Sequence, residues 1–214
     1  MKIKGLSVAA MGLLMTAAML AAQERPPRLC EFDGFSTSSK IAEVSAEKTT
    51  TAYFGCQSPG NCLPTALKPG DPVLVYKVDG DWTCGYLSQR NGAGPGWVRS
   101  KDIRLIAVDQ NPPVDAWLAT WRNGPNSIKI QKSKNPNALA LAGQAYWKGS
   151  ASEHTGEFSG EAAPHGNQLH FVESGSDSCT VDLTLLGKYL VADDNEKCGG
   201  MNVRFWGIWK RAAK

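Results

Sequence analysis

Short β-rich segments separated by turn residues run through most of this chain, and they restrict the folds open to it. Its 214 residues include 22 glycines and 12 prolines, scattered between runs rich in Val, Leu, Thr and aromatic side chains. No segment shows the spacing of an amphipathic helix, and no internal repeat occurs. Many short strands with regular turn signals are typical of sandwiches and barrels. The sequence therefore predicts an all-β protein.

Composition excludes two classes of protein. The chain is 42% hydrophobic and 20% charged, with seven tryptophans, whereas disordered proteins are poor in aromatics and strongly charged. Its 23 basic residues nearly cancel 20 acidic ones, so bulk charge does not predict nucleic-acid binding.

The first 22 residues have the form of a secretory signal peptide. Lys2 and Lys4 precede an uncharged run from Gly5 to Ala22 that ends in two alanines, so we expect cleavage after Ala22. The alternative is a membrane anchor, but the run is marginal against the ~20 apolar residues of a spanning helix. We therefore expect a periplasmic or secreted protein without stable membrane insertion after cleavage, whose formal charge of +3 falls by two.

Six cysteines follow this segment, and an even number in an oxidising compartment predicts disulfides. They are Cys30, Cys56, Cys62, Cys84, Cys179 and Cys198. Gly187-Lys188 has the form of a two-residue type II′ loop, which places Cys179 opposite Glu196 and close to Cys198. The other four cysteines allow three connectivities, of which we favour Cys56–Cys62 with Cys30–Cys84.

A polar segment with two prolines, residues 109–113, is the best candidate for a linker. It divides an N-terminal extension (23–39) and a first unit (40–108) from a second unit (114–214). In the first unit, Asp79-Gly80 predicts a hairpin in which Val75 faces Cys84 and Val73 faces Tyr86, so that these four side chains share a core face.

The second unit contains eight short β-rich segments, and the clearest runs from Cys179 to Leu185 with strict alternation. Such a series suits an antiparallel barrel of about eight strands, which leaves no exposed edge. Trp117, Trp121 and Trp147 are expected to pack in its core. The expected segments are 117–121, 127–131, 138–146, 155–161, 168–172, 179–186, 189–192 and 202–210.

Spaced residues in the first unit resemble a bacterial SH3-like domain over about residues 49–105. They are Gly70-x-x-Val73-x-Val75, Trp82, Gly96-Trp97-Val98, Ile103 and Leu105. The resemblance implies a small barrel that binds cell-wall or envelope ligands. It also implies a partly exposed aromatic patch, and Tyr53, Trp82 and Trp97 are the ligand-binding residues it predicts.

Two resemblances concern the second unit. Its opening tryptophan and its close, Phe205-Trp206-Gly207-Ile208-Trp209-Lys210-Arg211, loosely resemble lipocalin or avidin barrels. The string Asp194-Asn195-x-x-Cys198-Gly199-Gly200-Met201-Asn202-Val203-x-Phe205 resembles the C-terminal signature of poorly characterised secreted proteins of Gram-negative bacteria.

Residues with catalytic or metal-binding chemistry do not converge in the sequence. Cys179 lies in an alternating strand, which suits a disulfide better than a nucleophile. Pairing across Ala163–Gly166 would place His170 opposite Gly160 and leave His154 far from it, so no zinc site is expected. Asp193 to Glu196 lacks the spacing of a calcium loop and suits an Asx turn. We expect no metal, no cofactor and no enzymatic activity.

These observations favour a non-enzymatic binding module of the bacterial envelope, with peptidoglycan or an envelope protein as partner. One alternative is an inhibitor or immunity protein against an envelope hydrolase, because compact disulfide-rich β proteins suit that role. A second is an enzyme of unrecognised type.

Overall fold

The chain folds into two antiparallel β-sheets, which confirms the all-β prediction. The computed structural model describes residues 26–27, 29–35, 40–45, 47, 49–58, 61–89, 92–175 and 178–213. The predicted signal peptide and its cleavage site lie outside these residues. In the described part of the chain, no helix is long and apolar enough to cross a membrane.

The first sheet contains seven strands in the order β3-β2-β6-β5-β4-β1-β7. A single 3-10 turn, η1 (Ser100–Asp102), precedes its last strand. The strands are β1 (Lys40–Val44), β2 (Thr50–Ser58), β3 (Asn61–Leu67), β4 (Pro72–Asp79), β5 (Trp82–Gln89), β6 (Gly92–Arg99) and β7 (Ile103–Leu105).

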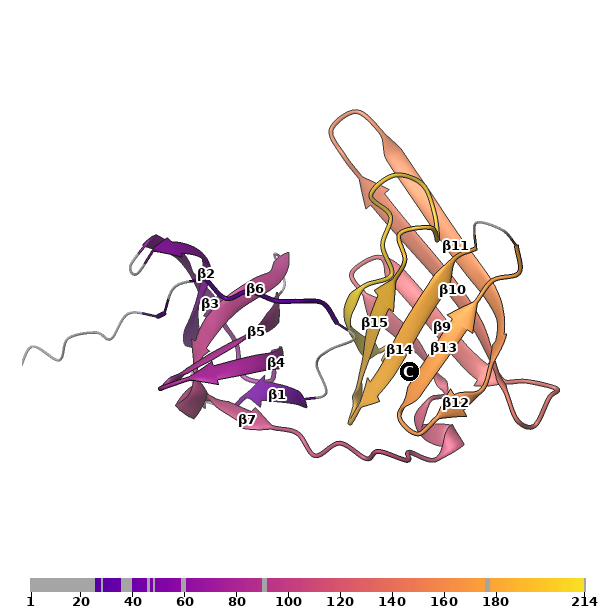
Figure 1. Cartoon of the computed structure of the whole chain (residues 1–214), viewed down its shortest axis with the longest axis horizontal. Coiled ribbons are helices and arrows are strands. Elements are labelled where there is room, and N and C mark those ends of the chain that lie inside the picture. The colour runs from indigo at the N-terminus through magenta and orange to yellow at the C-terminus, as the bar shows by residue number, and fades with distance from the viewer. Residues whose placement is uncertain are drawn as a thin grey trace, which may run out of the picture.

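The second sheet curls into a nearly closed barrel of nine strands, beside the first sheet in Figure 1, with the order β11-β10-β9-β8-β16-β15-β14-β13-β12. The 3-10 turn η2 (Val114–Ala116) leads into it. The strands are β8 (Ala119–Asn123), β9 (Asn126–Lys132), β10 (Leu139–Lys148), β11 (Glu153–Ala162), β12 (Pro164–His165), β13 (Gln168–Val172), β14 (Thr180–Leu186), β15 (Tyr189–Asp194) and β16 (Gly207–Arg211).

Large side chains fill the barrel interior. Trp117 and Trp121 are buried there, as the sequence predicts, together with Phe205 and Trp209 of the C-terminal segment. The alternating residues of β14 also point into this core, because Val181, Leu183 and Leu185 are all buried. The short β12 adds a ninth strand to the eight expected segments. The interior is therefore a packed core.

The register between β14 and β15 confirms the predicted turn, since Leu186 pairs with Tyr189 around Gly187-Lys188. The predicted register between β4 and β5 is wrong. Asp79 pairs with Trp82, so Gly80 and Asp81 form the turn, and a bulge follows between Val75 and Lys77.

This shift separates the predicted core face of the first unit. Val73 pairs with Leu87, and both pack in the core of the first sheet. Cys84 instead pairs with Lys77, beyond the bulge, and packs with tryptophans in a separate cluster. The bulge adds one residue to β4. Because side chains alternate between the two faces of a strand, the extra residue places Val73 and Val75 on the opposite face of the sheet from Cys84.

Three disulfides join the cysteines in the pairs that the sequence analysis favours. They are Cys30–Cys84, Cys56–Cys62 and Cys179–Cys198. The first ties the segment 29–35 to β5, and the third ties the loop after β15 to the residue that precedes β14.

An apolar cluster joins the two sheets. Leu74 and Ile41 of the first sheet pack with Tyr189, Val191 and Ile208 on the outer face of the barrel. Phe35 belongs to the same cluster, and the segment that carries it crosses from the first sheet to the barrel (Figure 1).

A buried carboxylate lies at the edge of this cluster. Tyr189 donates its hydroxyl hydrogen to Glu43 on β1, and the Lys188 ammonium lies 2.6 Å from the same carboxylate oxygen. Burial acts to raise the pKa of Glu43, but the hydrogen bonds from Lys188 and Tyr189 and the charge of Lys188 together hold that pKa below its ordinary value. The sheets are therefore joined by an ionised carboxylate whose bonding partners come from the turn between β14 and β15.

Replacing Cys179 and Cys198 together by Ser should lower the free energy of unfolding by about 3 kcal/mol, because the closed loop restricts the unfolded chain. Urea denaturation followed by tryptophan fluorescence measures this loss. The matched control replaces Cys56 and Cys62, which close a loop of only six residues' separation, and should cost about 1 kcal/mol less. An equal or larger loss in the control would contradict the prediction.

The Glu43 carboxylate should make stability depend on acid pH. Because its pKa is lowered by folding, its contribution is present above the ordinary value of 4.5 and is lost as pH falls through the lower folded value. When the pH is lowered from 5, the free energy of unfolding of Glu43→Gln should therefore decrease less than that of the wild type. Urea denaturation at each pH measures this difference. Glu173→Gln, at an exposed carboxylate, is the control. Parallel pH profiles for wild type and Glu43→Gln would contradict the prediction.

Candidate functional site

The three aromatic residues predicted to bind a ligand lie together in the first sheet. Tyr53 on β2 pairs with Trp97 on β6. The rings of Tyr53 and Trp82 meet edge to face, with centroids 5.5 Å apart. They share one cluster with the Cys30–Cys84 and Cys56–Cys62 disulfides. The fold thus brings together all three predicted residues.

Most of this aromatic surface is buried. Trp97 is 1% exposed and Trp82 is 5% exposed, whereas Tyr53 is half-buried. The Arg99 guanidinium also covers the Trp82 ring, 4.2 Å from its centroid. Tyr53 is therefore the residue of the three that presents ring surface, and the binding role of this patch stays a prediction.

The three histidines do not meet. The predicted pairing of His170 with Gly160 is wrong, because β11 ends at Ala162 and pairs with β10, while His165 pairs with Gln168 in a separate tight hairpin. His170 instead lies 2.6 Å from Asp182, Nδ1 to Oδ1, on an exposed outer face of the barrel. Among the described residues, no group of three or more His, Cys, Asp or Glu side chains is arranged to hold a metal ion.

A cavity of about 290 Å³ adjoins this histidine pair on the outer face of β13, β14 and β15. Phe35 of the N-terminal segment and Asp193 of β15 also line it. Burial raises the pKa of Asp193, against the lowering effect of backbone hydrogen bonds from Asp194 and Phe35. Asp193 therefore helps to fix the N-terminal segment to the barrel.

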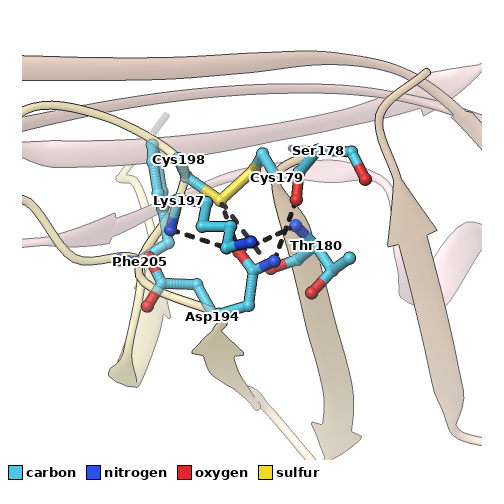
Figure 2. The surroundings of a disulfide bond; sticks show 8 residues. Ser178, Cys179, Thr180, Asp194, Lys197, Cys198 and Phe205 are labelled. Carbon is cyan, nitrogen blue, oxygen red and sulfur yellow. Dashed lines mark hydrogen bonds between the residues drawn. A yellow bond between two sulfur atoms is a disulfide. The ribbon is translucent and has the colours of Figure 1, made fainter. Parts of the chain in front are cut away.

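The residues of the C-terminal signature build a fixed loop at one end of the barrel, between β15 and β16. Asn195 accepts a hydrogen bond from the Thr180 amide at 3.1 Å and donates one to the Ser178 carbonyl at 2.9 Å. Asp194 accepts the Phe205 amide at 2.9 Å. Figure 2 shows how these bonds surround the Cys179–Cys198 disulfide. The acidic segment is thus a turn bonded to local backbone, the simpler of the two interpretations of its sequence.

Two glycines let this loop lie directly against β11. Gly199 forms a bridge with Gly156, and a Cβ atom added at Gly156 would lie 2.3 Å from the Cys198 carbonyl oxygen. Only glycine tolerates such a close approach of two backbones. The loop therefore packs down over the end of the barrel.

A groove of about 530 Å³ opens where this loop meets the β8–β9 turn and the end of β10. Three aromatic residues, three asparagines and one arginine contribute side chains to it. The lining residues are Asn123, Gly124, Pro125, Asn126, Tyr146, Trp147, Asn202, Arg204 and Trp206. Its volume falls in the range of roughly 300–1,000 Å³ that is usual for ligand sites.

Trp206 is 47% exposed, yet its ring is held in place. The Phe35 ring lies 5.9 Å from it between centroids, and the Arg204 guanidinium lies 5.6 Å from its centroid. Its carbonyl accepts a hydrogen bond from Asn123 at 3.2 Å. A large aromatic side chain is therefore fixed at the surface, on the rim of a groove.

No pattern in the sequence singled out this groove. Trp147 was predicted to pack in the core, and it does pack against it, but its side chain is only partly buried and also lines the groove. Trp206 was noted only as part of the close of the barrel. One signal was available: consecutive residues of an extended chain point to opposite sides, so Phe205 and Trp206 cannot both enter the core.

Comparison with protein-family models, curated proteins and solved structures finds no match to the chain.

Removing the Trp97 ring should destabilise the fold, because this ring is part of the core and not of a binding surface. Trp97→Ala should lower the free energy of unfolding by about 3–5 kcal/mol, as for other buried aromatics. Tyr53→Ala should cost less, about 1–2 kcal/mol, because that side chain is only partly buried. Chemical denaturation of both variants measures the difference. Equal losses in the two variants would show that Trp97 is not a core residue.

Proposed function

We propose that this chain is an exported, non-enzymatic binding module of the bacterial cell envelope, with peptidoglycan as its ligand. The observation that carries the proposal is the exposed Trp206 on the rim of the groove, with Tyr146 and Trp147 beside it. Three disulfides support export, because they are typical of compartments outside the cytoplasm.

Preorganisation supports a binding role for the groove. Trp206 is held by Phe35, Arg204 and Asn123, and the loop that carries it is fixed by the Cys179–Cys198 disulfide. A rigid surface loses little conformational entropy when a ligand binds. Large exposed apolar side chains also mark sites of interaction when they gather in a hollow.

The polar side chains that line the groove favour ligand binding over catalysis. Asparagine amides donate and accept hydrogen bonds but do not exchange protons near neutral pH, as general acids and bases must. Arg204 lies 2.8 Å from Glu196, so its charge is already paired. This supports a module without catalytic activity.

The proposal is tested by sedimentation with purified peptidoglycan sacculi. The wild type should sediment with the sacculi, and Trp206→Ala should bind them more weakly by about 1–3 kcal/mol, the contribution of one aromatic stacking contact. Val172→Ala, which removes apolar surface from another exposed residue of the same barrel, should bind like the wild type.

Two results would contradict the proposal. Wild-type protein that stays in solution would exclude peptidoglycan as the ligand. Inhibition of a purified envelope hydrolase by protein that does not sediment would favour an inhibitor.

A further inference from the structure

The side chains that line the groove also indicate which class of ligand it binds. Resting on the proposed function, we infer that the groove binds a neutral saccharide chain. Pyranose rings stack on Trp206 and its neighbouring aromatics, and sugar hydroxyl groups bond to the asparagine amides. This assigns the ligand's glycan part, not its peptide part, to the barrel.

The aromatic residues provide the stacking surface. Trp206 is 47% exposed, and Trp147 and Tyr146 at the end of β10 are half-buried. One face of a pyranose carries C–H groups that are apolar and slightly positive, whereas the face of an aromatic ring is negative. A saccharide therefore buries its apolar face on these rings while its hydroxyl groups remain at the rim.

The asparagines have hydrogen-bonding capacity left over. Asn126 accepts the Tyr146 amide through Oδ1, and Asn123 donates to the Trp206 carbonyl through Nδ2. Within the described residues, the Asn126 Nδ2, the Asn123 Oδ1 and the whole Asn202 amide have no further partner. A hydroxyl group both donates and accepts, so a polyhydroxylated ligand satisfies this mixed set of donors and acceptors.

Charge favours a neutral ligand. Arg204 is the one charged side chain among the described residues lining the groove, and Glu196 lies 2.8 Å from it. An anionic polymer would need unpaired basic groups, because its affinity comes largely from charge neutralisation. An uncharged sugar chain makes no such demand.

At the groove, the edge of β10 beyond its pairing with β9 has a backbone amide that is already bonded to a side chain. Peptides often bind by pairing with free backbone groups of a sheet edge. Here β9 pairs with β10 only as far as Gln144, and the next inward amide, that of Tyr146, is bonded to the Asn126 side chain. This capped edge favours recognition by side chains, as in saccharide binding, over strand addition.

The test is calorimetric titration with chitotetraose, a neutral linear saccharide, against full-length mature protein. Trp206→Ala should weaken binding roughly 5- to 150-fold, the loss of one stacking contact. Asn202→Gly should weaken it roughly 2- to 10-fold, as for one hydrogen bond. Glycine is chosen because Asn202 has a φ of 65°, which glycine adopts without strain. Val172→Ala should leave the affinity unchanged, and so should raising NaCl from about 50 to about 500 mM.

The outcomes separate this inference from the proposed function. Wild-type protein that sediments with sacculi but does not bind chitotetraose, or that binds isolated stem peptides instead, would overturn the saccharide site and leave the envelope role standing. Binding of chitotetraose that is lost in Trp206→Ala would support the site even if sacculi were not bound. Saccharide binding equal in Trp206→Ala, Asn202→Gly and wild type would overturn the groove as its location.

Discussion

The Cys179–Cys198 disulfide is the constraint on which the proposed site depends. It holds the loop after β15 against the start of β14, where Asp194 and Asn195 bond the backbone on both sides. The loop contains two residues with positive φ, Glu196 and Asn202, and this backbone conformation is unfavourable for residues other than glycine. Without the disulfide, the loop would therefore sample several conformations. With it, the loop lies across the barrel end and forms one wall of the groove.

The groove is also connected to the first sheet through aromatic contacts. The Phe35 ring lies 4.6 Å from Tyr86 and 5.9 Å from Trp206, between centroids. The Cys30–Cys84 disulfide fixes the same N-terminal segment to β5. The bond from Tyr189 to Glu43 joins the sheets a second time. The first sheet therefore supports the groove by restricting Phe35, although none of its described residues lines the groove.

Local patterns in the sequence predicted those parts of the fold that depend on neighbouring residues. The alternation along β14 and the Gly187-Lys188 turn together set a register that the structure confirms, and that register brought Cys179 near Cys198. The β4–β5 hairpin shows the limit. Its turn begins at Gly80 rather than Asp79, and a bulge between Val75 and Lys77 shifts its register by one residue.

The candidate site was harder to predict, because exposure depends on distant segments. Trp82 and Trp97 are covered by a cluster that includes two disulfides, one of which reaches back to Cys30. Trp206 remains at the surface because the groove forms where three segments far apart in the sequence meet. The resemblance to SH3-like domains directed attention to the first unit, whereas the larger exposed aromatic lies in the second.

The most direct test of the saccharide site follows the indole N–H signals of the seven tryptophans in a ¹⁵N NMR spectrum during titration with chitotetraose. We predict that the signals of Trp206 and Trp147 shift progressively, while those of the buried Trp97, Trp117, Trp121 and Trp209 do not move. Shifts confined to Trp82 and Trp97, with Trp206 unchanged, would place binding on the first sheet and contradict the groove as the ligand site.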